Sequence, residues 1–413
     1  MTPFPPRFLD LTAGSCLTAA HHGPVLRREA HDFRVEMVPP VAPAAGATKA
    51  DVRDQSALEQ RLGQSTSVIM PLLELGAIGY VTWVLYLIDP STELREDFNV
   101  QPRRAAGIAL IVVYAVLLLL LLIPWLRLLQ VIWSKPDLVP LGDTSVEKKD
   151  ITTSWLGQYD AYICDYEGMP LWCDKCHNWK PDRTHHCKEL GRCVRKMDHY
   201  CPWAGGIIAE TSHKFFMQFV FFGALYTSYL WIVTAIFLGE RISKTGARPG
   251  TWIGVLVVGV LFCIFTFTMT CMTGWNLCIN YTSVEGIQRG GVHNIAFLIA
   301  KYSDRSSLPS TPSARDKAQS HDDWPVLTTI QRSADRTYVV MQTKPHEHPW
   351  YTSLIMGWKD VMGNNAFDWS TSIRHSPYKQ RSHRGEFEWG ELVYDMAKQY
   401  ERQNPGVKLA LVN

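Results

Sequence analysis

Four long apolar blocks interrupt an otherwise polar chain. They run from about Ser67 to Ile88, Ala105 to Leu126, Phe215 to Leu238 and Thr251 to Met272. A membrane-spanning helix needs about 20 predominantly apolar residues, and each block reaches that length. The second is the clearest, because it carries no charge from Gly107 to Trp125. Helices of a soluble core are rarely so long and so apolar, so the pattern predicts four transmembrane helices.

The polar segments divide the rest of the chain. Residues 1–64 are rich in proline and alanine and show no secretory signal, so we expect a disordered N-terminal segment there. The expected order after it is helices 1 and 2 in 65–126, a cysteine-rich catalytic domain in 127–214, helices 3 and 4 in 215–273, and a C-terminal region in 274–413 with a polar linker near 303–323. Tyr338 to Gln342 has a strand-like pattern. The fold class that this order predicts is an all-α polytopic membrane protein, with a small zinc-bound domain between helices 2 and 3.

An even number of spans places both chain ends and the cysteine-rich loop on one side of the membrane. The positive-inside rule does not choose that side, because the two short loops are also basic: they hold Arg95, Arg103, Arg104, Arg241, Lys244 and Arg248. Cysteine chemistry is more informative, since the thiols within 173–201 need a reducing compartment to stay free or metal-bound. We therefore expect a multi-pass endomembrane protein whose N-terminus, C-terminus and cysteine-rich domain face the cytosol.

Composition and charge exclude some function classes. The 413 residues are 46% hydrophobic, too apolar for a disordered chain. The 41 Lys and Arg residues nearly balance the 39 Asp and Glu residues, for a net charge of +2. No overall basic field therefore points to nucleic acid. One charge interrupts the first apolar block: Glu74, just past Pro71. An intramembrane carboxyl group is a functional candidate, although one that faces a wet gap between helices is the simpler interpretation.

Residues 173–201 hold the pattern of a metal site, CDKCHNWKPDRTHHCKELGRCVRKMDHYC. Its candidate ligands come in two pairs, Cys173 with Cys176 and His186 with Cys193. Two thiolates on a tight turn, joined by a cysteine and a histidine from a second turn, suit tetrahedral zinc. The mixture of sulfur and nitrogen ligands favours zinc over hard cations. The spacing alone leaves His185 or Cys187 open as a replacement for His186.

Asp198-His199-Tyr200-Cys201-Pro202-Trp203 completes the block. A cysteine becomes a nucleophile when a neighbouring imidazole holds it as the thiolate. His199 lies two positions before Cys201, and such positions share a face in extended backbone but not in a helix. We therefore expect an extended or turned backbone, with Asp198 orienting the imidazole. The alternative is that this stretch supplies zinc ligands. Cys201 lies shortly before the third apolar block, so a thiol at the membrane surface suits a lipid-like electrophile.

Together these residues resemble the DHHC family of protein S-acyltransferases, the palmitoyltransferases. The motifs that carry the resemblance include Lys180-Pro181-Asp182-Arg183, His186-Cys187, Met197-Asp198-His199, Cys201-Pro202-Trp203 and Lys214-Phe215-Phe216. Asn280 to Glu285 is similar to the family's Thr-Thr-x-Glu segment, with serine for the second threonine. Pro349-Trp350 and the segment 357–363 are similar to its Pro-aromatic…Asn-Trp segment, with Gly357 in place of asparagine. The resemblance covers about 67–363 and implies four membrane helices around the cysteine-rich domain.

The resemblance also implies roles for individual residues. Cys201 would carry the acyl group, with His199 as base and Asp198 as its orienting partner. Cys173, Cys176, His186 and Cys193 would bind zinc. The family's second zinc site keeps only Cys187 here, because Leu190, Tyr200 and Ile207 occupy its other positions, so we expect one structural zinc and an apolar cluster. Tyr200 in place of the second tetrad histidine is similar to the DHYC variants of the fungal five-type branch.

The implied reaction moves palmitate from palmitoyl-CoA to cysteine thiols of client proteins. Lys180, Arg183 and His185 would meet the CoA phosphates, unless they are solvated charges. Tyr226 corresponds to the family's chain-length gate, unless it is ordinary helix packing. Partners would be acyl-CoA, the lipid bilayer, and cytosolic or membrane-associated clients with accessible cysteines, but not nucleic acid.

Two rival functions come from other classes. One is a catalytically silent zinc-binding membrane adaptor, which the reduced second metal site and Gly357 would fit. The other is a membrane thiol redox protein that uses the Cys173-x-x-Cys176 pair. His186 and Cys193 argue against the redox protein, because they complete a metal site around that pair.

Overall fold

The computed structural model describes residues 49–84, 104–145, 148, 154–287, 291–300, 323–333, 336–377 and 382–412. Arg53–Asn413 forms one compact unit, and the following description concerns it. Of the other unit, Met1–Val52, the described part is the first turn of a helix. Residues 1–48 and nearly all of the expected linker at 303–323 lie outside the described residues.

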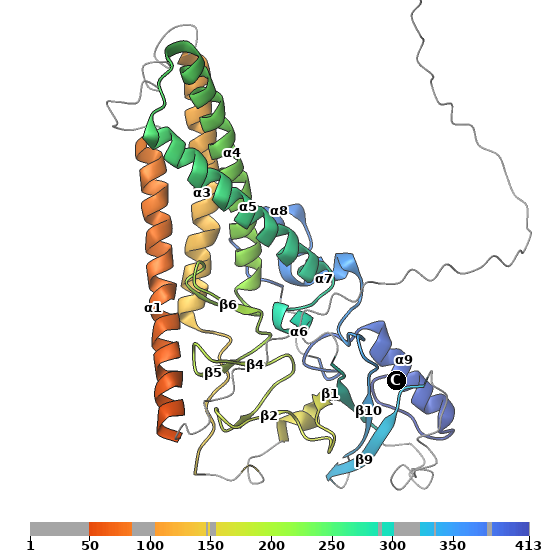
Figure 1. Cartoon of the computed structure of the whole chain (residues 1–413). Coiled ribbons are helices and arrows are strands. Elements are labelled where there is room, and N and C mark those ends of the chain that lie inside the picture. Colours follow the sequence, from red (N-terminus) through yellow and green to blue (C-terminus); the bar gives the residue numbers. More distant parts are fainter. Residues whose placement is uncertain are drawn as a thin grey trace, which may run out of the picture. The chain divides into compact units, whose positions relative to one another are not determined.

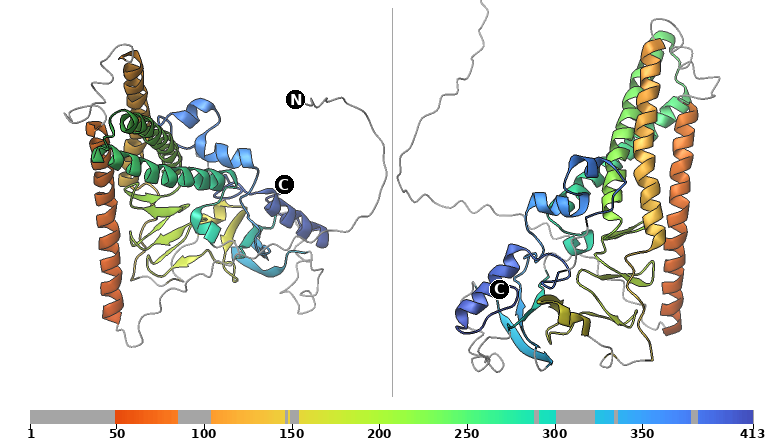
Figure 2. Two further views of the ribbon diagram at one scale, coloured as in Figure 1. Left: turned by 45° about the horizontal axis from the view of Figure 1, so that its top comes forward. Right: turned by 180° about the vertical axis from the view of Figure 1, so that it is seen from behind.

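Four long apolar helices organise the chain (Figure 1): α1 (Lys49–Thr82), α3 (Arg104–Ser134), α4 (His213–Thr245) and α5 (Gly250–Cys278). Each is long and apolar enough to cross a membrane, which confirms the four predicted spans. α4 packs against both α3 and α5 (Figure 2). The cysteine-rich block falls between the second and third of these helices, as expected.

The first helix begins earlier than expected. α1 starts at Lys49, so residues 49–64, which were expected to be disordered, are helical. Part of this extension contacts the cysteine-rich block: the Tyr200 hydroxyl donates to the Gly63 carbonyl at 3.1 Å, and Lys188 lies 3.6 Å from Glu59. The hydropathy of neighbouring residues does not indicate partners that lie so far apart in the sequence.

The chain is not all-α, and that part of the prediction is wrong. An antiparallel sheet in the order β1-β8-β10-β9 is built from β1 (Ala161–Cys164), β8 (Asn294–Leu298), β10 (Arg336–Gln342) and β9 (Val326–Ser333). These strands are short and come from both the loop between helices and the C-terminal region, so their pairing is non-local. Alternate side chains such as Ile295, Phe297 and Val339 pack with Val393 and Tyr400 of α9 (Glu391–Gln403) in one core.

Three small hairpins form the cysteine-rich block. They are β2 (Trp172–Cys173) with β3 (Asn178–Trp179), β4 (His185–Cys187) with β5 (Arg192–Val194), and β6 (His199–Cys201) with β7 (Gly206–Ile208). The short helices are η3 (Ser154–Gln158), α6 (Ser283–Ile287), α7 (Leu354–Met362) and α8 (Ala366–Ser370). The hairpins carry the predicted metal ligands and Cys201. Val361 and Met362 of α7 share a buried cluster with Cys201, and Ser283 of α6 contacts Asp198.

Candidate active site and metal centre

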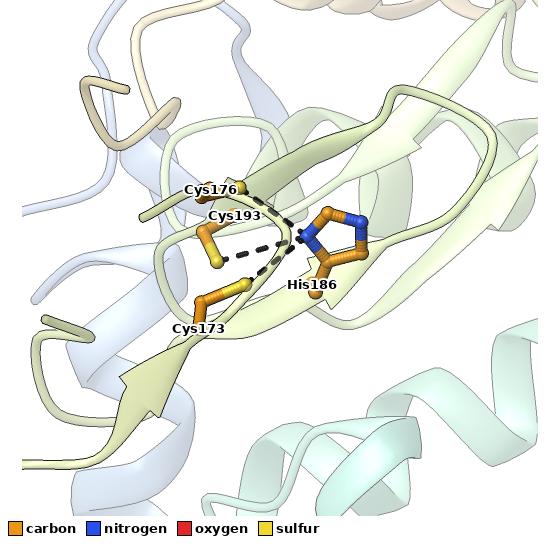
Figure 3. A group of neighbouring side chains, drawn as sticks. All are labelled: Cys173, Cys176, His186 and Cys193. Atoms are coloured by element: carbon orange, nitrogen blue, oxygen red, sulfur yellow. Dashed lines mark hydrogen bonds between the residues drawn. The ribbon is translucent and has the colours of Figure 1, made fainter. Parts of the chain in front are cut away.

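Two hairpins bring the four predicted metal ligands together. Cys173 ends β2 and Cys176 lies in the turn that follows, while His186 and Cys193 face each other as a cross-strand pair of β4 and β5. The four ligand atoms all lie within 4.8 Å of one another. Figure 3 shows the three sulfur atoms directed at Nδ1 of His186, at 3.5 Å from Cys173, 3.3 Å from Cys176 and 3.9 Å from Cys193.

These distances fit a tetrahedral metal. Zinc bonds of about 2.3 Å to sulfur and 2.0–2.1 Å to nitrogen give sulfur–nitrogen edges of about 3.6 Å in a tetrahedron. The three cysteines are buried, and Val139 packs against them. The geometry selects His186, rather than its neighbours His185 or Cys187, as the fourth member of the cluster. This Cys/His cluster can hold a metal ion.

The positions of a second metal site form an apolar cluster instead. Cys187 and Ile207 are buried together with Val194 and Met197, and Leu190 and Tyr200 pack against them. Tyr200 and Ile207 are cross-strand partners in the β6–β7 hairpin. Within the part of the chain that the structure describes, the cluster around His186 is the one group of metal-ligating side chains that meets at a point.

The third hairpin positions His199 and Cys201. Both residues lie on β6, so the extended backbone directs them to one face, and Cys201 is close enough to His199 to raise the pKa of its imidazole. His199 Nδ1 lies 2.5 Å from Asp198 Oδ2. Asp198 therefore pairs directly with the imidazole that shares a face of β6 with the Cys201 thiol. None of the three belongs to the metal cluster.

The electrostatics of these residues favour a proton on the imidazole. Burial lowers the pKa of His199, but the interactions with Asp198 and Cys201 outweigh it and raise the pKa to about 10. Burial would raise the pKa of Asp198, yet the neighbouring His213 and His199 and the Ser283 amide hold it well below its ordinary value. Asp198 is therefore a carboxylate at neutral pH, and the imidazole beside the thiol is a strong proton acceptor.

The carboxylate of Asp198 is held from a distant part of the chain. The Ser283 amide of α6 donates to Oδ1 at 2.7 Å, and the Ser283 hydroxyl lies 3.2 Å from Oδ2. The buried His213, at the start of α4, places Nε2 3.9 Å from Oδ1. In the sequence, only the resemblance of Asn280 to Glu285 to a family motif marked this segment, and it did not indicate a partner.

The Arg183 side chain is buried and paired with other groups of the protein, and is not a free cation. Its guanidinium donates to both carboxylate oxygens of Glu285, at 2.7 and 2.6 Å, and to the Asn280 side chain and carbonyl. It also lies over the Trp350 ring at 4.8 Å. Burial would raise the pKa of Glu285, but the Arg183 charge lowers it to about 2. Because the Arg183 side chain is 1% exposed, a CoA phosphate would have to displace Glu285 to reach it.

The other two candidate CoA contacts differ from Arg183. Lys180 and His185 are both partly exposed. Burial, followed by the charges of Lys180 and Arg183, lowers the pKa of His185 against the opposing charge of Glu285. His185 is therefore a neutral imidazole at neutral pH, which can donate a hydrogen bond to a phosphate but adds no charge.

An apolar cavity lies among α1, α3, α4 and α5. Cys201 is buried in a cluster with residues of α3 and α4, against which Phe219 packs. Phe219 also lines the cavity, together with Leu121, Tyr226 and Phe262. The hydroxyl of Tyr226 lies 3.2 Å from that of Tyr114, which lies 2.6 Å from the Thr82 hydroxyl. These hydroxyl contacts thus link α1, α3 and α4 beside Tyr226.

Comparison with known proteins agrees with this site. The family model described as DHHC palmitoyltransferase matches residues 167–290, which include the metal cluster, Cys201 and Ser283. The chain is 28% identical to palmitoyltransferase pfa5 of Emericella nidulans, over 83% of this chain and 87% of that protein. It is 27% identical to palmitoyltransferase pfa5 of Aspergillus fumigatus, over 83% and 91%, and 26% identical to palmitoyltransferase PFA5 of Saccharomyces cerevisiae, over 53% and 62%. Residues 167–290 therefore match a DHHC palmitoyltransferase domain, and most of the chain is similar to proteins named palmitoyltransferase.

Proposed function

We propose that the chain is a protein S-palmitoyltransferase that transfers palmitate from palmitoyl-CoA to client cysteines through an acyl-Cys201 intermediate. The observation that carries the proposal is the Asp198–His199 pair on the same strand face as Cys201. An apolar cavity is linked to the cluster around Cys201 through Phe219. The family-model match and the similar proteins support the reaction type.

In the first half of the reaction Cys201 attacks palmitoyl-CoA. His199 holds the thiol proton before the attack, because the raised pKa of its imidazole favours a pair of Cys201 thiolate and protonated imidazole. The thiolate sulfur forms a bond to the thioester carbon, and the bond from that carbon to the CoA sulfur breaks. The leaving CoA thiolate takes the proton from His199. The products are free CoA and a palmitoyl thioester on Cys201.

In the second half a client thiol takes the acyl group. His199, now neutral, accepts the proton of the client cysteine, whose sulfur attacks the thioester on Cys201. Cys201 leaves as a thiolate paired with the protonated imidazole. Asp198 stays ionised throughout and fixes the tautomer and the orientation of His199. The cycle needs no oxidant and no external base.

The cavity gives the palmitoyl chain an apolar site. At about 0.8 kcal/mol per buried methylene, a sixteen-carbon chain represents on the order of 12 kcal/mol of burial. Phe219 links the cavity to the surroundings of Cys201, so the thioester and the chain can be held at once. Tyr226 is proposed to limit chain length because it lines this cavity and is tied to Tyr114. Lys180 and His185 remain the proposed contacts of the CoA phosphates.

One structural zinc is proposed at Cys173, Cys176, His186 and Cys193. It would hold the β2–β3 and β4–β5 hairpins together, and structural zinc contributes folding free energy directly. The apolar packing of Cys187, Leu190 and Ile207 would do the same for the third hairpin without a metal. Because the cluster needs a reducing compartment, we propose that it and both chain ends face the cytosol.

One reason for the alternative, a catalytically silent adaptor, was Gly357, which stands where the family has asparagine. The structure gives this glycine a packing role instead. Its backbone lies so close to the end of α5 that a β-carbon would meet the Leu277 and Cys278 carbonyl oxygens at 2.5 and 2.4 Å. Glycine at 357 is therefore required by the packing of α7 on α5 and does not indicate a lost activity.

A two-stage transfer assay tests the proposal. Purified full-length protein is loaded with alkyne-tagged palmitoyl-CoA, freed of unbound acyl-CoA, and given a cysteine-containing client peptide or its serine version. We expect label to leave Cys201 and appear on the cysteine peptide as a hydroxylamine-sensitive thioester. Label that never reaches the cysteine peptide, or that reaches the serine peptide equally, would contradict transfer.

A further inference from the structure

The intramembrane cavity contains two polar atoms that palmitate transfer does not use. Its lining is largely apolar, but Glu74 of α1 and Trp125 of α3 both contribute to it. Within the described residues, Glu74 Oε2 and Trp125 Nε1 are buried and have no hydrogen-bond partner. A straight palmitoyl chain cannot satisfy either of them.

The other polar side chains of the cavity have partners. The Thr227 hydroxyl donates to the Gly223 carbonyl at 2.7 Å, and the Thr266 hydroxyl donates to the Phe262 carbonyl at 2.7 Å. Tyr226 is paired with Tyr114. The two unmatched atoms are therefore the exceptions in this cavity: a carboxyl oxygen, which can accept or, when protonated, donate, and an indole N–H, which can only donate.

Leaving such groups unpaired is unfavourable. A buried polar group without a hydrogen bond destabilises the folded protein, and an ionisable side chain inside a membrane is a functional candidate by default. A carboxyl and an indole N–H that both line one cavity can be satisfied together by a ligand that both accepts and donates.

Both groups lie close to the reactive end of the cavity. Pro71 lies beside Gly205, four residues after Cys201, because a β-carbon on Gly205 would meet the Pro71 ring at 3.7 Å. Glu74 is three residues further along α1, or about 4.5 Å at 1.5 Å per residue. Trp125 stacks on Phe219 at 6.1 Å, and Phe219 packs against the cluster that contains Cys201. A bound acyl chain would thus pass these groups soon after the thioester.

We propose that Glu74 and Trp125 form a subsite for a hydroxyl group on the acyl chain, so that hydroxylated long-chain acyl-CoA is a substrate class of this enzyme. The hydroxyl oxygen accepts from the Trp125 Nε1–H, and the hydroxyl hydrogen is donated to Glu74 Oε2. A hydroxyl can match Glu74 whether that carboxyl accepts or donates, while an ammonium group would repel the indole N–H. The inference rests on the proposed acyl transfer.

Competition between acyl donors tests the subsite. The full chain is incubated with equal amounts of palmitoyl-CoA and one monohydroxypalmitoyl-CoA, with the hydroxyl position varied along the chain, and the acyl groups on Cys201 are measured by mass spectrometry. In the wild type we expect the hydroxylated chain to be favoured at one or two neighbouring positions. A hydrogen bond of about 0.5–1.5 kcal/mol corresponds to roughly a 2- to 10-fold preference.

Substitutions identify the groups responsible. Glu74→Leu and Trp125→Phe should each abolish the preference while both chains are still transferred, and the second variant serves if the first does not fold. Thr227→Val removes a hydroxyl that already has a partner, so the preference should persist. Equal use of the palmitoyl and hydroxypalmitoyl groups at every hydroxyl position, in wild type and variants alike, would overturn the subsite. Glu74 and Trp125 would then bind water only. Absence of any acyl group on Cys201 would instead overturn the acyl transfer on which the inference rests.

Discussion

The amide of Ser283 donates a 2.7 Å hydrogen bond to Oδ1 of Asp198, although the two residues lie 85 positions apart in the chain. The opposite oxygen of the same carboxylate contacts His199 at 2.5 Å. A backbone group at the start of α6 therefore fixes the carboxylate that orients the imidazole. Through this bond the segment after α5 becomes part of the proposed catalytic arrangement.

Removing that amide should impair acylation. Ser283 is the first residue of α6, where proline is tolerated in a helix because no intrahelical bond is lost. Ser283→Pro deletes the amide donor to Asp198 together with the hydroxyl, whereas Ser283→Ala deletes the hydroxyl alone. A hydrogen bond to a charged group contributes about 1.5–3 kcal/mol, so we expect a roughly 10- to 100-fold lower rate of Cys201 acylation in a single-turnover measurement. Ser283→Ala keeps the amide and should stay within a few-fold of wild type. Equal losses in the two variants would show that the amide is not the important group.

The Arg183–Glu285 pair should be essential for stability. Breaking a buried pair by removing one partner costs about 3–5 kcal/mol, and Arg183→Met leaves Glu285 buried without its partner. We expect a large drop in melting temperature for the detergent-solubilised protein. The control is the exposed pair Lys188–Glu59, whose side chains are 66% and 62% accessible. Lys188→Met should change the melting temperature little, because exposed pairs contribute at most about 1 kcal/mol. Similar shifts of the melting temperature in the two variants would contradict a stabilising role of the Arg183–Glu285 pair.

Alkaline pH should weaken the contribution of His199 to stability. Its pKa is raised from an ordinary 6.5 to about 10 in the folded protein, so the folded state binds the proton more tightly than the unfolded state does. That contribution is complete below pH 6.5 and is lost as the pH rises towards 10. The stability difference between wild type and His199→Gln should therefore shrink over this range in melting curves. A difference that is constant or grows with pH would contradict the raised pKa.

Metal content should depend on one set of cysteines and not on the neighbouring one. Cys173→Ser removes a zinc ligand, and apparent binding free energies of structural zinc are about 10–16 kcal/mol, so this variant should lose its metal and fold poorly. Cys187→Ser changes a buried thiol of the apolar cluster and should retain one zinc per chain by elemental analysis. Two zinc ions in the wild type, or loss of zinc from Cys187→Ser, would contradict a single metal site.

The sequence predicted those parts of the molecule that depend on local pattern. The four membrane helices follow from unbroken apolar length, and the cluster of Cys173, Cys176, His186 and Cys193 from ligand spacing. The extended backbone that places His199 beside Cys201 was required by their separation of two residues, and β6 has it.

Non-local pairing accounts for what the sequence did not show. β1 pairs with β8 across more than a hundred residues, and short strands of this kind carry little signal of their own. The contact of Ser283 with Asp198 has the same origin. Arg183 carries the charge expected of a phosphate contact, but nothing in the local sequence indicates that Glu285 and Asn280 use that charge internally.

The most direct test of the account is labelling of the purified full chain with alkyne-tagged palmitoyl-CoA, with Cys201→Ser and Cys187→Ser compared with wild type at equal zinc content. The account predicts a hydroxylamine-sensitive thioester on wild type and Cys187→Ser, and none on Cys201→Ser. Thioester labelling that persists in Cys201→Ser would contradict it.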